Sequence, residues 1–249
     1  MSHCGGDAAA LEHGRRLAEA RLALSTVKAL RLAKRLYSYR ELSRATGVPA
    51  PMLSRYVTGR SLPSPETAAR ILEALERLAD PRRALAERMA ETGGVIDTSV
   101  VLTEPLYLLL ATLVFVKRFQ GLGATRILVP EASGIPLAAS LSLELELPFT
   151  VARRAQPGLQ GWLCSHEAPI FCVPRGVLGR SDRIIIVDDI VETGRTLRAL
   201  RRLAEGAGAR IVAVAALVVV GEEWATVSGI PHVDALISLT KPASRVPGF

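Results

Sequence analysis

Two adjacent carboxylates, Asp188 and Asp189, directly follow the unbroken β-branched run Ile184 to Val187. Such a run is typical of a central parallel strand covered on both faces, and open α/β sheets bind ligands at the carboxyl ends of their strands. Because adjacent carboxylates repel each other, they need hydroxyl groups or a cation as partners. A ribose diol or a magnesium ion would supply these, so we expect a ligand site here.

A short glycine-containing loop follows the two acids and leads into an amphipathic helix that carries Leu197, Leu200 and Leu203 on one face. The free amides of a helix N-terminus and the hydroxyls of flanking threonines are suited to binding a phosphate group. We therefore predict a phosphate cradle made of Glu192, Thr193, Gly194, Arg195 and Thr196.

The spacing of apolar residues along the chain changes near residue 93. Before it, apolar residues recur at helical spacing, and after it strand-length apolar runs alternate with helical segments, which predicts a doubly wound parallel sheet. The predicted strands are Ile127 to Val129, Phe149 to Val151, Ile184 to Val187, Ile211 to Val220 and Ala235 to Leu239. Since two consecutive glycines follow Thr92, we predict an all-α domain over 1–92 and an α/β domain over 93–249.

The all-α part contains two short helices separated by a glycine turn. Ser38 and Glu41 form a capping box at the start of the first helix, and Gly47 suits the left-handed turn that ends it. The second helix spans Ala50 to Thr58, and Ser64 is expected to cap a further helix. This layout resembles the helix-turn-helix DNA-binding domain of the Cro/phage-repressor class. The alternative is a helical domain for dimerisation or capping.

The charge of the chain agrees with contact to a polyanion. The net charge is +7, and the segment His13 to Arg60 alone holds 11 basic and 2 acidic residues. Such a concentration of positive charge favours binding to double-stranded DNA by counterion release. By the resemblance, the second helix enters the major groove. The residues expected at bases are Met52, Ser54 and Arg55, and those expected near phosphates are Arg60 and Ser61.

Composition indicates a folded protein, since 49% of the residues are hydrophobic. The longest apolar stretch, Pro105 to Val116, is shorter than the ~20 residues that a membrane-spanning helix needs. The first residues also lack the order of a secretion signal, so we expect a cytoplasmic protein with no membrane contact. By the usual bias of such proteins, Cys164 and Cys172 are expected to be free thiols.

The stretch VDDIVETGRTL resembles the signature of type I phosphoribosyltransferases. The resemblance implies the fold of that family and a phosphoribosyl ligand, either phosphoribosyl pyrophosphate (PRPP) or a purine nucleotide. It implies that Asp188 and Asp189 hold the ribose hydroxyls and that the loop Thr193 to Thr196 holds the 5′-phosphate. Val191 is the expected base contact.

Other stretches are similar to the same family in order and spacing, over roughly residues 100 to 240. They most resemble the subgroup that contains xanthine phosphoribosyltransferase and the bacterial purine-operon repressor. The resemblance implies pyrophosphate contacts at Ala132, Ser133, Gly134, Arg153 and Arg154. Magnesium is expected as a companion of PRPP and not as a metal held by protein ligands.

The segment that matches the mobile loop of the family, Ala155 to Ala168, departs from what an enzyme needs. Besides Cys164 its only ionisable side chains are those of His166 and Glu167, and Arg154 stands where the family has lysine. No catalytic residue is assigned for this reason. Two functions stay open: a dimeric transcription regulator that senses the phosphoribosyl ligand, or an active purine phosphoribosyltransferase whose extra helices serve assembly. A protein with both functions is also compatible with the sequence.

Overall fold

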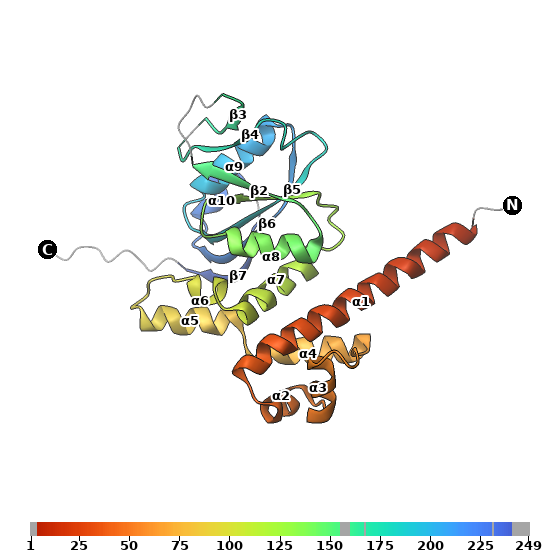
Figure 1. The fold of residues 1–249 in the computed structure, drawn as a ribbon. Coiled ribbons are helices and arrows are strands. Elements are labelled where there is room, and N and C mark those ends of the chain that lie inside the picture. The colour runs from red at the N-terminus through yellow and green to blue at the C-terminus, as the bar shows by residue number, and fades with distance from the viewer. Residues whose placement is uncertain (1–3, 155–159, 167, 231, 241–249) are drawn as a thin grey trace. The chain divides into compact units, whose positions relative to one another are not determined.

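The computed structural model describes residues 4–154, 160–166, 168–230 and 232–240. They divide into two compact units, one of residues 1–84 and 105–110 and another of residues 85–104 and 111–249 (Figure 1). The domain boundary predicted between residues 92 and 93 falls just after helix α5 (Pro81–Glu91), and it stays a prediction.

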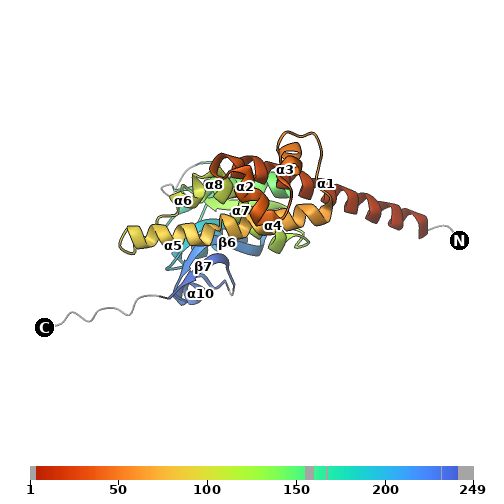
Figure 2. The ribbon, with the colours of Figure 1, turned by 90° about the horizontal axis from the view of Figure 1, so that it is seen from below.

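The first unit is helical and consists mainly of α1 (Cys4–Leu36), α2 (Tyr39–Thr46), α3 (Ala50–Val57) and α4 (Pro65–Leu78). Helices α2, α3 and α4 gather against the C-terminal part of α1 (Figures 1 and 2). The predicted capping box is confirmed, because Ser38 accepts from the Glu41 amide while the Glu41 carboxylate accepts from the Ser38 amide. Gly47 ends α2 with φ 68°, a conformation that costs glycine little.

Apolar side chains from all four helices form the core of this unit. Fully buried members are Leu30, Leu42, Leu53, Ile71 and Leu75. At the end of α3, Arg31 donates from Nε to the carbonyl oxygen of Val57 over 2.9 Å, which satisfies one of the carbonyls that a helix C-terminus leaves open. The core thereby fixes α3 with one face inward and the other in solvent.

The second unit is built around one sheet. Its elements are α6 (Ser99–Leu102), α7 (Pro105–Phe119, of which 105–110 group with the first unit), β1 (Arg126–Pro130), α8 (Ile135–Leu145), β2 (Phe149–Arg154), β3 (Trp162–Cys164), β4 (Phe171–Pro174), β5 (Arg183–Val191), α9 (Arg195–Gly206), β6 (Arg210–Val220), α10 (Glu223–Ser228) and β7 (Asp234–Leu239). All five predicted strands are therefore present in the sheet.

The order of the strands is β3-β4-β2-β1-β5-β6-β7, and β2, β1, β5, β6 and β7 are parallel. The chain passes from β1 through α8 to β2 on one side, and from β5 through α9 to β6 on the other. Because crossovers of this kind are right-handed, α8 and α9 lie on opposite faces of the sheet (Figure 1). The direction of winding reverses between β1 and β5, which is where such sheets form a ligand crevice.

Strand β5 is longer than the predicted run, which ended at Val187. It continues to Val191 because its ladder with β6 continues, with Asp188 opposite Ala216 and Val191 opposite Val219. The two acids are thus held in a strand with paired neighbours. Their position is set by the sheet and not by a free loop.

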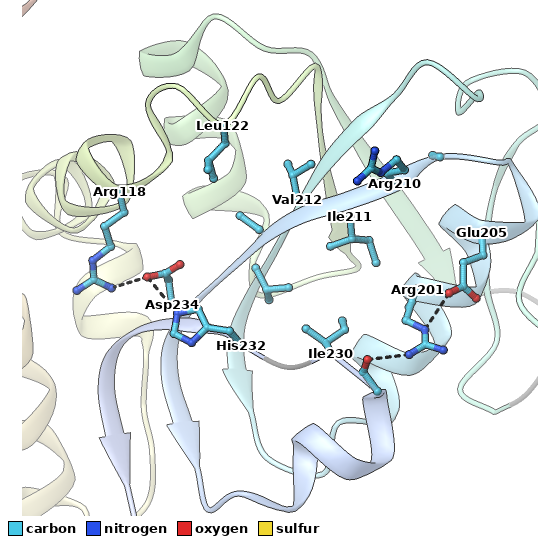
Figure 3. A pocket seen from close by; sticks show the side chains of 14 residues that line it. Arg118, Leu122, Arg201, Glu205, Arg210, Ile211, Val212, Ile230, His232 and Asp234 are labelled. Carbon is cyan, nitrogen blue, oxygen red and sulfur yellow. Dashed lines mark hydrogen bonds and ion pairs between the residues drawn. The ribbon is translucent and has the colours of Figure 1, made fainter.

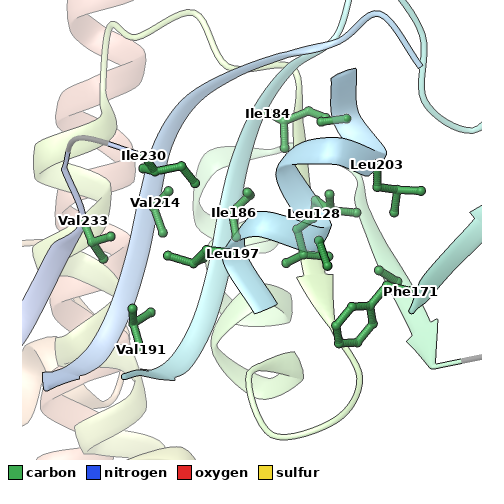
Figure 4. Packing of buried hydrophobic residues seen from close by; sticks show 14 of the residues in the cluster. Leu128, Phe171, Ile184, Ile186, Val191, Leu197, Leu203, Val214, Ile230 and Val233 are labelled. Carbon is green, nitrogen blue, oxygen red and sulfur yellow. The ribbon is translucent and has the colours of Figure 1, made fainter. Parts of the chain in front are cut away.

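One face of the sheet and α9 share a core of buried aliphatic side chains (Figure 4). Leu197, Leu200 and Leu203, the predicted apolar face of α9, are each at most 1% exposed. They pack with residues of the central strands, among them Leu128 and Ile186. This packing fixes the start of α9 against the end of β5.

The expectation of free thiols at Cys164 and Cys172 is wrong, because the two cysteines form a disulfide. Part of the segment predicted as a loop is strand β3, which pairs antiparallel with β4 and places Cys164 directly opposite Cys172. Spacing along the chain did not reveal this, since the pairing depends on a hairpin. Residues 155–159 and 167 of the segment lie outside the described residues.

No helix in the described part of the chain has the length and apolar character needed to cross a membrane. The apolar stretch Pro105 to Val116 forms most of α7, of which Leu106, Leu110 and Phe115 are fully buried.

The two faces of α3 should differ sharply in their contribution to stability. Replacing the fully buried Leu53 by alanine should lower the free energy of unfolding of the first unit by about 2–5 kcal/mol, because it leaves a cavity. Met52→Ala, on the 38% exposed neighbour, is the matched control and should change it by less than about 1 kcal/mol. Denaturant unfolding followed by circular dichroism measures both, and equal losses would contradict the assignment of faces.

Candidate functional site

The glycine loop after β5 is held in place by the start of α9 and by α10. Gly194 is the N-cap of α9 with φ 72°, in the left-handed region that favours glycine. A Cβ at this position would collide with the backbone carbonyl of Trp224. Both observations explain why glycine stands here. The loop therefore turns sharply into the N-terminus of α9, the end of a helix that favours anions, and there the amide of Arg195 donates to Thr193 Oγ1 over 3.5 Å.

The two acids before the loop are almost entirely buried, with Asp188 7% and Asp189 8% exposed. Asp189 accepts hydrogen bonds from Thr98 Oγ1 at 3.0 Å and from Ser133 Oγ at 2.8 Å, one at each carboxylate oxygen. Asp188 accepts one from the amide of Asp189 at 3.0 Å. The protein thus satisfies Asp189 at both oxygens, and Asp188 is the acid that faces the adjoining cavity.

Burial, and after it the neighbouring charge of Asp189, together raise the pKa of Asp188 to about 8. The backbone hydrogen bond from Asp189 lowers it, but by less than these causes raise it. Near neutral pH Asp188 therefore keeps its proton, as expected for a buried carboxyl group beside a second one. A ligand that donates hydroxyl groups to the pair, or a cation beside it, would favour the ionised form.

The loop after β1 lies against the same acids. A Cβ on Gly134 would meet the Cα of Asp188 at 3.2 Å, which is too close for an ordinary contact. Gly134 thus allows the start of α8 to approach β5, and its neighbour Ser133 reaches Asp189. The preceding peptide bond, between Glu131 and Ala132, is cis. The predicted pyrophosphate contacts, Ala132 to Gly134, thus lie beside the predicted ribose contacts, Asp188 and Asp189.

A cavity of about 160 Å³ lies between the end of β5 and the start of α9. Its lining contains most of the predicted cradle and the predicted base contact, namely Asp188, Val191, Glu192, Thr193, Gly194 and Thr196, together with Ile190 and Leu197. Of the cradle residues, only Arg195 is not among the lining residues. The cavity combines carboxyl, hydroxyl and amide groups, so it is suited to a hydroxylated phosphate ester.

The predicted pyrophosphate arginines stand apart from this cavity. Arg153 and Arg154 are exposed at the end of β2, opposite Cys172 and Phe171 of β4. The guanidinium of Arg154 lies 5.8 Å from the centre of the Phe171 ring, and its amide donates to Glu131 Oε2 over 3.2 Å. Neither arginine lines the cavity, although the bond to Glu131 connects β2 to the loop after β1.

Sequence reasoning missed three residues that shape the site: Thr98, Glu131 and Trp224. Thr98 is 91 residues from its partner Asp189, and no local pattern marks it. Trp224 contacts Gly194 through its backbone, so its side chain carries no signal. Glu131 directly precedes Ala132, the first of the predicted pyrophosphate contacts, but was not itself predicted.

On the first unit, α3 presents the predicted reading face to solvent. Met52, Arg55 and Arg60 are exposed and Ser54 is half-buried, whereas Leu53 and Tyr56 are buried in the core. The Ser61 hydroxyl is enclosed and has no hydrogen-bond partner among the described residues. In the structure as it stands, that hydroxyl does not face outward with the others.

Buried paired acids, a glycine loop at a helix N-terminus and a polar cavity at the switch point of a doubly wound sheet are features typical of α/β domains with a phosphate-ligand site. Residues 109–233 match the phosphoribosyl transferase domain family, and the chain belongs to this family. Residues 27–78 match a helix-turn-helix family, which places both kinds of domain in one chain.

Curated relatives agree with the family. The chain is 37% identical to a hypoxanthine/guanine phosphoribosyltransferase of Methanobacterium lacus, over 46% of this chain and 62% of that protein. It is 29% identical to a xanthine phosphoribosyltransferase of Moorella thermoacetica, over 54% of this chain and 77% of that protein. It is 34% identical to HGPRTase-like protein 2 of Haloterrigena turkmenica, over 47% and 66%. The chain thus spans less than two thirds of the first and third of these relatives.

Solved structures share the fold. The adenine phosphoribosyl transferase of Trypanosoma brucei, solved with AMP, pyrophosphate and ribose-5-phosphate, superposes with a TM-score of 0.51 at 22% identity, over 58% of this chain and 68% of that one. The adenine phosphoribosyltransferase of Leishmania donovani gives a TM-score of 0.50 at 20% identity, over 61% and 76%.

The proton held by Asp188 should make the stability of the fold depend on pH. Because the pKa of Asp188 is about 8 in the folded chain and near 4 when unfolded, the folded state holds an extra proton between these values. The stability that the fold gains by holding this proton is fully present below about pH 4 and is lost as the pH rises to about 8. Asp188→Asn carries no such group, so its stability relative to the parent should rise by on the order of 2 kcal/mol from pH 5 to pH 8.

Thermal unfolding at a series of pH values measures this difference. Glu192→Gln is the control, since that side chain is exposed beside the same loop, and it should follow the parent at every pH. A difference in stability between Asp188→Asn and the parent that stays constant over this pH range would refute the raised pKa of Asp188.

Proposed function

We propose that this chain is a DNA-binding transcription regulator whose phosphoribosyltransferase-type domain, residues 93–249, binds PRPP or a purine nucleotide as effector. Residues 1–92 are the proposed DNA-binding domain, acting on double-stranded DNA. The observation that carries the proposal is the presence in one chain of a helix-turn-helix match and a phosphoribosyl transferase domain. A free enzyme of nucleotide metabolism has no need of a DNA-reading helix.

The acids and the glycine loop provide the proposed ligand contacts. Asp188 and Asp189 accept the ribose hydroxyls, and the loop from Thr193 to Thr196, with Glu192 beside it, holds the 5′-phosphate. The cavity of about 160 Å³ supports this, because it combines Asp188 with the loop and the start of α9. The T. brucei relative of this fold was solved with ribose-5-phosphate and AMP, ligands of the same chemistry.

The remaining contacts concern the pyrophosphate and the base. Ala132, Ser133 and Gly134 would contact pyrophosphate through the loop after β1, with Arg153 and Arg154 supplying positive charge from β2. Magnesium would enter with PRPP, where it neutralises phosphate charge, and the carboxylates nearby fit its preference for oxygen ligands. Val191, 2% exposed at the end of β5, is the proposed contact to the base.

The DNA contacts would come from α3. Its outward residues Met52, Ser54 and Arg55 are proposed to face bases, and Arg60 and Ser61 to lie near phosphates; for Ser61 this requires its enclosed hydroxyl to turn outward. Since helix-turn-helix proteins read palindromic half-sites as dimers, we also propose a symmetric homodimer. The basic segment His13 to Arg60 supports an electrostatic contribution to binding.

An active purine phosphoribosyltransferase is the alternative, and the names of the curated relatives favour it. Against it, the described part of the loop segment contains one ionisable side chain, that of His166, besides the disulfide-bonded Cys164. A developing pyrophosphate charge needs positioned donors for stabilisation, and the described part of this segment offers no lysine or arginine.

The two domains should be separable by mutation. Arg55→Ala should weaken binding to the DNA upstream of the gene about tenfold, because a bidentate base contact is worth ~1–3 kcal/mol, and it should leave PRPP binding unchanged. Asp188→Asn with Asp189→Asn should do the reverse and abolish the response to PRPP. Gel shift at moderate salt with and without Mg²⁺–PRPP measures both. Arg70→Ala, an exposed arginine of α4, is the charge-matched control.

Loss of both properties in both variants would show that the two-domain assignment is wrong. If the chain had no DNA affinity at moderate salt but released pyrophosphate from PRPP with xanthine, guanine, hypoxanthine or adenine, the enzyme alternative would replace the proposal.

A further inference from the structure

A second and larger cavity, of about 690 Å³, lies in the second unit away from the acids and the glycine loop (Figure 3). It is formed by the first half of β6, the end of α7, the second half of α9 and the segment that leads into β7. Asp188 pairs with Ala216, whereas the cavity is lined by β6 residues 210–214. The two cavities therefore lie toward opposite ends of the parallel strands and share no lining residue.

The cavity exists because β6 extends beyond its neighbour. Pairing between β6 and β7 begins only at Ala215, opposite Asp234. Among the described residues, 210–214 of β6 thus have no neighbouring strand on that side, while β5 pairs with most of them on the other. Backbone groups along such an edge remain available for hydrogen bonds to a ligand. Ladder pairing also skips Val212, since Ile184 faces Ile211 and Ile185 faces Ala213.

The walls of the cavity are apolar and its rim is charged. Apolar side chains come from Leu122, from Ile211 to Val214, and from Ile230, and Figure 3 shows the charged side chains around them. A volume of about 690 Å³ falls within the usual range for sites that bind small molecules, which are mostly apolar with a few polar groups.

Three arginines stand at the rim, and two of them are already engaged by the protein. Arg118 pairs with Asp234 at 3.4 Å. Arg201 pairs with Glu205 at 3.0 Å and donates to the carbonyl oxygens of Ser228 and Gly229. The guanidinium of Arg210, in contrast, has no hydrogen-bond or ion-pair partner among the described residues. It is the cation that a ligand could engage without breaking an existing pair.

We propose that this cavity is a binding site for a small organic anion with an aromatic or otherwise apolar body. The body packs on Ile211 to Val214, and the carboxylate, sulfonate or phosphate group pairs with Arg210. A small molecule fits better than an extended peptide, because α7 and α9 wall the strand edge and His232 and Asp234 stand where β7 begins. The proposal is independent of the phosphoribosyl site and of DNA binding.

The test compares two fluorescent probes of similar shape and different charge, anilinonaphthalene sulfonate and its uncharged relative N-phenylnaphthylamine. The sulfonate should bind the full-length protein with one high-affinity site. Arg210→Gln should weaken its binding by about tenfold, the effect of losing a charge-assisted contact, and leave binding of the uncharged probe within about twofold. Ala213→Phe, which fills the cavity, should weaken both probes.

Arg175→Gln is the matched control, because Arg175 is an exposed arginine of the same unit outside the cavity lining. It should leave both probes unaffected, and circular dichroism checks that each variant is folded. Sulfonate binding that survives both Arg210→Gln and Ala213→Phe would overturn the proposal. Absence of sulfonate binding to the parent would also overturn it. If, in that case, a short polyglutamate peptide bound the parent but not Ala213→Phe, the strand edge would be assigned to a peptide instead.

Discussion

Repulsion between the buried carboxyl groups of Asp188 and Asp189 is the constraint around which the site is organised. Two charges in adjacent positions of a buried strand cannot both persist without partners. In the structure Asp189 accepts hydrogen bonds from the hydroxyls of Thr98 and Ser133, while burial, and after it the charge of Asp189, raises the pKa of Asp188 to about 8. One acid is thus fixed as a structural acceptor, while the other keeps a proton that a ligand could replace.

The rest of the second unit holds these acids beside a phosphate-binding loop. Winding in opposite directions from β1 and β5 brings the loops after both strands to one crevice. Gly134 permits the close approach of the first loop to Asp188, and Gly194 permits the sharp turn of the second loop against the backbone of Trp224. Neither glycine could be exchanged without moving the backbone on which the acids stand, so fold and site depend on the same close contacts.

Local signals in the sequence predicted much of this arrangement. The β-branched run, the paired acids and the apolar face of Leu197, Leu200 and Leu203 predicted β5, the loop and α9, and the capping residues of α2 predicted the first of the two short helices. The features that were not predicted depend on contacts between segments that are distant in the sequence. Thr98 reaches Asp189 across 91 residues, the disulfide requires the β3–β4 pairing, and the second cavity requires β7 to start later than β6.

The central claim is that the acid pair accepts the ribose hydroxyls of a phosphoribosyl ligand, and calorimetric titration with Mg²⁺–PRPP at pH 7 in buffers of different ionisation enthalpy tests it most directly. Because hydroxyl donors favour the ionised carboxylate, binding should release close to one proton per site from the parent chain. Asp188→Asn, which has no proton to lose there, should release none. PRPP binding with equal proton exchange in both proteins, or no binding to the parent, would contradict the account.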